Sequence, residues 1–356
     1  MGGAKDIKQE IRAEAFDLGF VLCGFSAAKT PHHYDHYLRW LEAGCHAEMD
    51  YMARPNAISA REHPEALLPG CQTVISLAMA YGPAAKAVKN EGSALRGWIA
   101  AYATYPDYHK VMSSSLNALV DRFESLLSKA TFIAVDTAPI LEKEFAVSGG
   151  LGWIGRNSLL TNPMYGSWLL LGEILTTVEF EEDQETVTID CRDCQRCVMA
   201  CPTKAIRPDR SIDSRRCLSY LTIEYRGSIP ENFRELMGDR VFGCDACQTA
   251  CPYNRDLVSL PSPEFGKPTI DSSQDLFEAF RWSEAEFIAR FANTPVLRCR
   301  YQGWRRNAAV ALGNCNDPQG IPVLQEAFQK ELDPVVREAI GWAMIRLGQT
   351  VQPSNQ

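Results

Sequence analysis

The chain has 356 residues, of which 46% are hydrophobic and 22% charged, and its formal net charge is −8. This composition is typical of a globular protein with two or three domains, and the negative charge excludes general affinity for nucleic acid but not a local basic patch. No apolar run approaches the ~20 residues that a membrane span needs, and the start MGGAKD matches neither a signal peptide nor a complete myristoylation motif. We therefore expect a cytoplasmic monomer without membrane attachment.

Residues 1–185 contain short apolar runs that alternate with helical patterns. An apolar stripe that ends before Gly19 predicts the first helix, and its members are Ile7, Ile11, Ala15 and Leu18. Strands are predicted at residues 20–25, 73–80, 132–136 and 168–177, and a further helix from about Pro139 to 147. We therefore expect an α/β (α+β) domain in which helices cover a sheet.

A glycine-rich segment follows that second helix. Gly150, Gly152 and Gly155 match the pattern G-x-G-x-x-G of dinucleotide-binding folds. That fingerprint must follow a strand and open a helix, whereas here it follows a helical segment, so we reject NAD binding. A loop of this kind still allows backbone N–H groups to approach a large flat ligand closely.

Eight of the 13 cysteines lie between positions 191 and 251. The first run, CRDCQRCVMACP, has the C-x2-C-x2-C-x3-C-P spacing of bacterial ferredoxins, in which the fourth cysteine binds the other cluster. The second run, CDACQTACP, lacks one cysteine, and Cys217 between the runs can replace it. Since each [4Fe–4S] cluster takes four thiolates, the eight cysteines predict two clusters.

The spacing also predicts how these cysteines are divided. One cluster is expected to take Cys191, Cys194, Cys197 and Cys251, and the other Cys201, Cys217, Cys244 and Cys247. Zinc sites or buried free thiols are the alternatives, but a proline after the last cysteine of each run favours ferredoxin-type clusters. Residues 186–258 should thus form a ferredoxin-like two-cluster insert, whose clusters are shielded by Ile206, Tyr220, Tyr225 and Phe242.

The other five cysteines have no partner motif. They are Cys23, Cys45, Cys71, Cys299 and Cys315. We expect them to be small buried hydrophobic residues in a reducing compartment, because a disulfide framework is typical of secreted proteins.

Residues 259–356 are predicted to be entirely helical, with no strand after about residue 270. Segment 306–313 resembles segment 337–344, an offset of 31 residues, and Asp317-Pro318 and Asp333-Pro334 mark expected helix starts. This is the size of a HEAT-type repeat, so we expect an all-α HEAT-like region that packs on the rest of the protein. An ordinary helical bundle is the alternative.

Basic residues gather at the start of this region. They are Arg298, Arg300, Arg305 and Arg306, with Tyr301 and Trp304 among them. Basic residues interleaved with aromatic residues suit an RNA stem–loop with splayed bases, so we predict nucleic-acid contact here. The alternative is that these arginines pair with carboxylates such as Asp317.

The segment DTAPILEKEFAVSGGLGWIGRNSLL (136–160), followed by two ferredoxin-type runs and a HEAT-like tail, resembles the epoxyqueuosine reductase family. The resemblance extends over nearly the whole chain. It implies the last step of queuosine synthesis, in which epoxyqueuosine at the tRNA wobble position is reduced to queuosine with cobalamin and two [4Fe–4S] clusters. It also implies a tRNA anticodon stem–loop as partner and an external electron donor.

Cobalamin is implied by this resemblance alone. The residues expected to line its pocket are Gly152, Trp153, Gly155, Arg156, Asn157 and Ser158. Arg156 is expected to meet the corrinoid phosphate, and a plain surface charge is the alternative. The base-on motif D-x-H-x-x-G is incomplete because Met112 stands at its glycine position, which fits a family that binds the corrinoid without a histidine ligand to cobalt.

Three residues are expected at the reacting centre. Asp136 matches the DTAP aspartate of the family, and we predict a proton donor whose burial raises its pKa and keeps it protonated near neutrality. A helix N-cap is the alternative. Tyr108 and His109 are predicted hydrogen-bond donors near cobalt or substrate; in their segment YATYPDYHK, Tyr105 and Pro106 depart from the basic family pattern, so contacts from those two positions are not carried over.

Two other functions share parts of this pattern. A corrinoid reductive dehalogenase would share both cofactors, but such enzymes are usually exported and have no use for a HEAT-like tail. A simple electron carrier would need only the ferredoxin-like segment, which is a small part of this chain.

Overall fold

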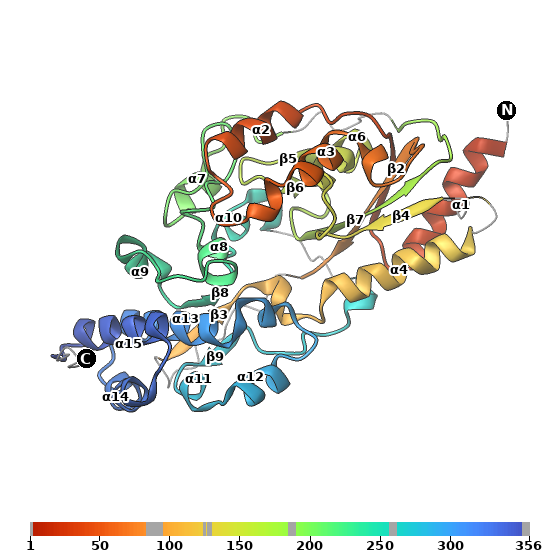
Figure 1. The fold of residues 1–356 in the computed structure, drawn as a ribbon. Coiled ribbons are helices and arrows are strands. Elements are labelled where there is room, and N and C mark those ends of the chain that lie inside the picture. Colours follow the sequence, from red (N-terminus) through yellow and green to blue (C-terminus); the bar gives the residue numbers. More distant parts are fainter. Residues whose placement is uncertain are drawn as a thin grey trace.

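A four-stranded antiparallel sheet forms the centre of the N-terminal region (Figure 1). The computed structural model describes residues 3–82, 95–123, 126, 130–183, 190–255 and 262–350. The strand order is β1-β2-β7-β4, and all neighbours are antiparallel. The bounds are Leu22–Ala27 for β1, Thr73–Ala80 for β2, Leu169–Thr176 for β7 and Thr131–Ala134 for β4.

Helices cover both faces of this sheet, whose central strands are largely buried and mostly apolar. Strand β2 is buried along its whole length, and Ile174 and Leu175 of β7 belong to different apolar clusters. Helix α4 (Tyr108–Arg122), with α1 (Gly3–Asp17) beside it, packs on one face, and α6 (Glu142–Ser148) packs on the other. The predicted helix-covered sheet of an α/β domain is confirmed.

The predicted ranges differ little from the observed ones, except at the second helix. The strand expected at 20–25 occupies 22–27, and the strand at 73–80 is found as predicted. The helix expected from Pro139 begins only at Glu142, because residues 135–140 form a series of bends. Those bends place Asp136 on a loop.

The remaining elements of the N-terminal region are short. They are α2 (Tyr34–Glu42), α3 (Pro55–Glu62), β5 (Trp153–Ile154) and β6 (Leu160–Thr161). Strands β5 and β6 form a hairpin that contains Gly155, whereas Gly150 and Gly152 precede it.

The cysteine-rich segment consists mainly of short helices. Helices α7 (Arg196–Ala200) and α10 (Ala246–Thr249) carry cysteines of the two runs and pack against each other. The segment also contains α8 (Leu218–Ile223), α9 (Glu231–Met237) and β8 (Arg240–Phe242). Gln248 is buried and donates to the Tyr81 hydroxyl at 3.0 Å and to the Ser167 carbonyl at 2.8 Å, which attaches the second run to the N-terminal region.

A second sheet joins the three expected domains. Its order is β8-β3-β9, with β3 at Arg96–Ile99 and β9 at Ser273–Asp275, so each strand comes from a different predicted domain. One large apolar cluster likewise combines Ile99, Phe242 and Trp304. The expectation of no strand after about residue 270 is wrong, because β9 pairs with β3 at the edge of this sheet. The division at 1–185, 186–258 and 259–356 stays a prediction.

The C-terminal region is otherwise helical. It contains α11 (Glu278–Arg281), α12 (Glu284–Arg290), α13 (Arg300–Asn314), α14 (Gly320–Lys330) and α15 (Pro334–Arg346). The two similar segments lie in α13 and α15, which pack side by side (Figure 1). Asp333 caps α15 as predicted, whereas Asp317-Pro318 lies in the turn before α14.

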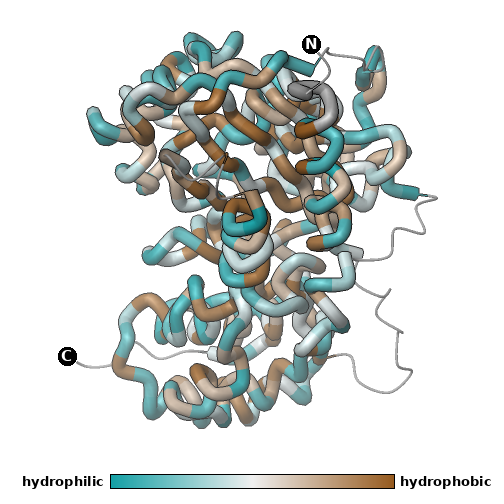
Figure 2. The backbone as a smooth tube through the Cα atoms, turned by 90° about the vertical axis from the view of Figure 1, so that its right-hand side faces the viewer, coloured by the Kyte–Doolittle hydropathy of each residue, from teal (hydrophilic) through white to brown (hydrophobic). Residues whose placement is uncertain are grey.

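The α/β region and the C-terminal helices lie at opposite ends of the molecule, as do the two termini (Figures 1 and 2). No helix in the described ranges is long and apolar enough to cross a membrane. Of the five cysteines outside the runs, three are buried as predicted, and Cys23 and Cys315 are partly buried.

Candidate active site

A cavity of about 740 Å³ lies where the three regions of the chain meet. Its wall is formed by the first turn of α4, the loop after β4, the start of α8 and the residues that precede α13. Asp136 and Cys217 both line it. A candidate acid and a candidate cluster ligand therefore face one space.

The predicted catalytic residues meet in this cavity. The Tyr108 hydroxyl donates to Oδ2 of Asp136 at 2.7 Å, and Nε2 of His109 lies 3.3 Å from the same oxygen. On the other side of the imidazole, Nδ1 of His109 lies 2.8 Å from Oδ1 of Asp107. The imidazole is thus held between two carboxylates, an arrangement that favours its protonated form.

These contacts determine where the proton resides. The pKa of His109 is raised to about 9, first by its hydrogen bond with Asp107 and then by its contact with Asp136. Burial raises the pKa of Asp136, but His109 and Tyr108 outweigh this effect and hold the pKa below its ordinary value. The expectation of a protonated Asp136 is therefore wrong. The side chain is about half exposed to the cavity (51%) and is paired with a cation, so the network holds its proton on His109.

The backbone of Asp136 also has an unusual conformation. Its φ is 49°, in the left-handed region that few residues other than Gly, Asn and Asp adopt. Its N–H donates to Oε1 of Glu142 at 2.6 Å. The alternative role of Asp136 as a helix N-cap is not observed, because Leu141 occupies that position of α6.

The first predicted set of cysteines is gathered in space. The pKa of Cys197 is raised by burial and, among neighbouring groups, by Cys191, Cys251 and Cys194. Since ionised groups influence one another in this way only at short range, the Cys197 thiol lies near thiols of both runs. The predicted exchange of ligands requires such proximity, and the division of the eight cysteines into two sets stays a prediction.

The second set is gathered in the same way. The pKa of Cys217 is raised to about 11 by burial, with smaller contributions from Cys244 and Cys201. Burial also raises the pKa of Cys247, followed by Cys217, Cys244 and, from the other predicted set, Cys197. Cys217 and Cys244 pack against the apolar cluster that contains Tyr220 and Phe242, which agrees with the predicted shielding.

The spacing of these thiols bears on the zinc alternative. Within the described ranges, no three His, Cys, Asp or Glu side chains are close enough to hold a single metal ion. Zinc needs four ligands at about 2–2.3 Å from one ion. A four-iron cluster holds its four thiolates farther apart, so the arrangement fits clusters better than zinc.

The glycines of the segment after α6 are required by close packing. A Cβ on Gly152 would lie 2.2 Å from the Thr161 carbonyl oxygen, and one on Gly155 would lie 2.8 Å from Oδ1 of Asn157. The segment lies between α6 and β6. This order differs from the strand-then-helix order of a dinucleotide site and agrees with the rejection of NAD binding.

Two buried nitrogens of this segment have no hydrogen-bond partner among the described residues. They are Nε1 of Trp153 and Nε of Arg156. Trp153 packs edge-on against Tyr253, with ring centroids 4.9 Å apart, and Nη2 of Arg156 donates to the Arg192 carbonyl at 2.6 Å. The segment therefore touches both cysteine runs and retains free donors for a ligand.

The four arginines near α13 do not form one surface. Arg306 is only 1% exposed, and it donates to the carbonyl oxygens of Leu221 at 2.6 Å and Tyr225 at 2.8 Å. Arg305 pairs with Glu331 at 2.5 Å. The prediction of nucleic-acid contact is wrong for Arg305 and Arg306, because both side chains attach α13 to neighbouring elements.

The other two arginines are accessible. Arg298 lines the cavity and forms an ion pair with Glu224. Arg300 is exposed at the start of α13. Only these two of the four remain candidates for contact with nucleic acid.

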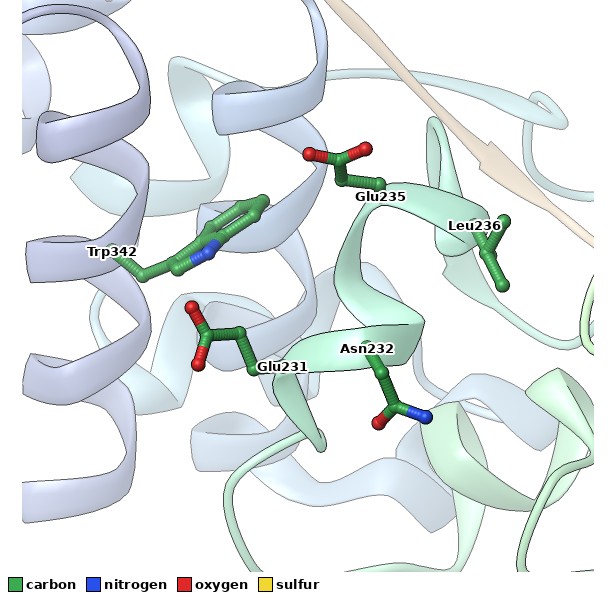
Figure 3. A pocket seen from close by; sticks show the side chains of 5 residues that line it. All are labelled: Glu231, Asn232, Glu235, Leu236 and Trp342. Carbon is green, nitrogen blue, oxygen red and sulfur yellow. The ribbon is translucent and has the colours of Figure 1, made fainter.

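A second hollow, of about 630 Å³, lies between α9 and α15 (Figure 3). Glu231 and Glu235 extend from α9 on either side of the Trp342 ring (Figure 3). Arg234 and Arg346 both lie 5.6 Å from the centroid of that ring, and Arg346 pairs with Glu235. None of the predicted catalytic residues lines this hollow, so it is a groove between packed helices.

Sequence reasoning missed two residues of the network. Asp107 is the first residue of the incomplete motif D-x-H-x-x-G. Its side chain caps α4 by accepting the His109 N–H at 3.1 Å, and an Asp two residues before this N–H is the sequence signal for such a cap. Glu142 carries no local signal, because its contact with Asp136 exists only through the fold of the loop.

Comparisons with known proteins find relatives that extend over nearly the whole chain. An epoxyqueuosine reductase from Pseudomonas aeruginosa is 40% identical over 97% of this chain and 95% of its own length. The structure of epoxyqueuosine reductase from Streptococcus thermophilus is 30% identical and covers 98% of this chain and 92% of that chain, with a TM-score of 0.88. An epoxyqueuosine reductase with a tRNA-Tyr epoxyqueuosine-modified stem loop is 26% identical and covers 98% and 100% of the two chains, with a TM-score of 0.83.

Three family models match separate parts of the chain. Residues 61–137 match epoxyqueuosine reductase QueG, DUF1730. Residues 190–254 match the 4Fe-4S double cluster binding domain, and residues 304–330 match the PBS lyase HEAT-like repeat. The cysteine-rich segment is therefore a double [4Fe–4S] domain.

Proposed function

Because this chain belongs to the epoxyqueuosine reductase family, we propose that it reduces epoxyqueuosine in a tRNA anticodon stem–loop to queuosine. The observation that carries the proposal is the cavity lined by both Asp136 and Cys217. Reduction of an epoxide to an alkene consumes two electrons and two protons and releases the oxygen as water. A site for this reaction must bring an electron source and a proton source to one bound substrate.

The electrons would come from the two clusters. Cys191, Cys194, Cys197 and Cys251 would hold one cluster, and Cys201, Cys217, Cys244 and Cys247 the other, as their grouping supports. The second cluster would be the one next to the substrate, because Cys217 itself lines the cavity. An external donor would reduce the clusters one electron at a time.

A bound cobalamin is the second part of the proposal. When bound, it would supply the redox-active, nucleophilic cobalt for this reaction. The unpartnered Nε1 of Trp153 and Nε of Arg156 support this cofactor, since the rim of a corrinoid carries carboxamide oxygens that accept hydrogen bonds. The predicted phosphate contact of Arg156 would have to use its Nε, because Nη2 already donates to the Arg192 carbonyl oxygen.

The first proton would come from the pair of His109 and Asp136. With a pKa of about 9, His109 is an imidazolium at neutral pH. As negative charge develops on the epoxide oxygen, Nε2 of His109 would transfer its proton to Asp136, which passes it to that oxygen. Tyr108 would hold the carboxylate in place, and the second proton would come from water that enters the cavity.

A tRNA stem–loop would dock over the mouth of the cavity. The relative solved with an epoxyqueuosine-modified stem loop supports this substrate. Arg298 and Lys110 line the cavity, and exposed Arg300 lies nearby in the chain, so local cations are available on a protein of net charge −8. We also propose that the protein acts as a cytoplasmic monomer with no membrane attachment.

An anaerobic assay tests the proposed function. The full chain, with clusters and cobalamin bound, would be mixed with a low-potential reductant and a stem–loop oligonucleotide that carries epoxyqueuosine. We expect mass spectrometry of the digested nucleosides to show loss of one oxygen atom, in a reaction that requires both cofactors. An unchanged nucleoside in the presence of both would contradict the proposal.

A further inference from the structure

The loop that carries Asp136 is held in a conformation that the residue does not favour by itself. Asp136 has a φ of 49°, and residues 135–140 form bends without helix or strand. A non-glycine residue in the left-handed region persists only where the surrounding contacts hold it. The contacts of Asp136 therefore decide whether its carboxylate stays in the cavity.

Contacts hold Asp136 at two places. At the cavity, its carboxylate meets Tyr108 and His109. At the backbone, its N–H donates to Oε1 of Glu142 at 2.6 Å. Within the described ranges, Glu142 is the one side chain that binds the backbone of Asp136.

Glu142 is itself held on a rigid element. It is the first residue of α6, where a carboxylate interacts favourably with the helix dipole. The next residue, Lys143, donates to the Ser158 carbonyl oxygen at 2.8 Å, and α6 packs on β1, β2 and β7. The bond from Asp136 to Glu142 thus connects a loop of bends to a fixed helix.

We propose that Glu142 is a positioning residue that keeps the Asp136 loop in the cavity by accepting the Asp136 backbone N–H. Without this bond, Asp136 leaves its left-handed conformation and its carboxylate withdraws from His109. The inference rests on the proposed function only in treating Asp136 as the group that delivers the proton. This hydrogen bond between the Asp136 N–H and Glu142, called the latch below, does not depend on the substrate.

The latch depends on the length of the Glu142 side chain rather than on its charge. Its charged and titratable neighbours are Asp136, Lys143, Glu173, Arg61 and Tyr108. Burial and the charge of Asp136 raise the pKa of Glu142 to about 7, so both protonation states are populated near neutrality. A carboxyl oxygen accepts a hydrogen bond in either state, and the amide oxygen of Gln can take its place.

Two variants of Glu142 separate the effect of side-chain length from the effect of charge. Glu142→Asp keeps the charge and suits the helix start, but its side chain is one methylene shorter and cannot span the distance. Glu142→Gln removes the charge and keeps the length. We expect the Gln variant to behave like the wild type and the Asp variant to lose the latch. Glu144→Gln is the matched control, because Glu144 lies on the same helix and, among the described residues, its side chain hydrogen-bonds to exposed His33 and not to the Asp136 loop.

The first readout is the titration of His109 by nitrogen NMR in the full chain without substrate. In Glu142→Asp, His109 loses one of its two carboxylate partners, so its pKa should fall by about 1 unit or more. Deuterium exchange over residues 135–141 should become faster in the same variant. Glu142→Gln and Glu144→Gln should keep both values of the wild type.

Turnover is the second readout. A misplaced Asp136 should lower turnover by roughly 10-fold to 100-fold in Glu142→Asp, while Glu142→Gln stays near the wild type. Wild-type titration and exchange in Glu142→Asp, or a loss of the latch in Glu142→Gln, would overturn the proposal. Because titration and exchange need neither substrate nor cobalamin, they decide on the latch even if queuosine formation is not observed.

Discussion

The cysteines that hold the clusters lie between positions 191 and 251, and most follow one another at intervals of three or four residues. The proton network, in contrast, joins the first turn of α4 to the loop after β4, and Glu142 adds a contact from α6. The spacing within each cysteine run is local, although each predicted cluster also takes thiols from distant positions, and the proton network exists only once the sheet and its helices are in place. In the proposed reaction, electron transfer would thus depend mainly on residues of short motifs, and proton transfer would depend on tertiary structure.

The cavity is where these two kinds of construction meet. Cys217 belongs to the local region and Asp136 to the tertiary one, and both side chains line the same space. We expect substitutions in either region to stop the same reaction but to have different effects on the bound iron. Loss of a cysteine removes iron, whereas damage to the network leaves the iron in place.

The largest effect is expected from Cys217→Ser. The cluster beside the cavity loses a ligand, so bound iron should fall from about eight to about four per chain and turnover should disappear. Iron analysis and an anaerobic absorption spectrum measure the first change. Cys315→Ser, which alters a partly buried cysteine outside both sets, is the control. Full iron content in Cys217→Ser would break the assignment of this ligand.

Asp136→Asn tests the tertiary region in the same assay. The amide keeps the shape of the side chain but cannot pass a proton, so turnover should fall by ~100-fold, the scale of acid–base contributions. Iron and cobalamin content should not change. Asp121→Asn, at the exposed far end of α4, should behave like the wild type. Near-normal turnover in Asp136→Asn would remove this residue from the mechanism.

The four arginines near the start of α13 are expected to act differently, although they are close together in the sequence. Changing Arg298 and Arg300 together to Ala should weaken stem–loop binding and flatten its dependence on log salt by up to about two. Arg306 is held inside the fold, and partly buried Arg305 is paired with Glu331.

The buried pair should affect folding instead. Arg306→Ala leaves carbonyl oxygens of the cluster segment without a donor, so the free energy of unfolding should fall by roughly 3 kcal/mol. Denaturant titration measures this loss, and a salt titration of stem–loop binding measures the other effect. A stable Arg306→Ala variant with a flattened salt slope would reverse the two assignments.

The smallest effect at neutral pH is expected from titration of His109. Its pKa is raised to about 9, so the imidazolium is present below that pH and is lost as pH rises through it. Turnover should therefore stay level near neutrality and fall above pH 9. The stabilisation from the imidazolium should be fully present below the ordinary pKa of about 6.5 and should be lost as pH rises from there through 9. A pH–rate profile checks this, and His109→Gln should lack the alkaline decline. A decline centred near pH 6.5 would contradict the network.

The sequence predicted those parts of the molecule whose physics is local. Strand β2 is buried along its whole length and was located correctly, and the cysteine spacing predicted the double [4Fe–4S] domain that a family model matches at residues 190–254. The protonation of Asp136 could not be predicted, because it depends on His109 and Tyr108, which lie 27 and 28 positions earlier in the chain. The burial of Arg306 has the same origin, since its partners are carbonyl oxygens of another segment.

The most direct test of the central claim is a crystal structure of the chain bound to a stem–loop that carries epoxyqueuosine. Two hollows in the described part of the chain are the cavity at Asp136 and Cys217 and the groove at Trp342. We predict that the modified base enters the first, with its epoxide oxygen within about 3 Å of the Asp136 carboxylate. A modified base bound in the groove at Trp342, or held away from both Asp136 and Cys217, would contradict the account.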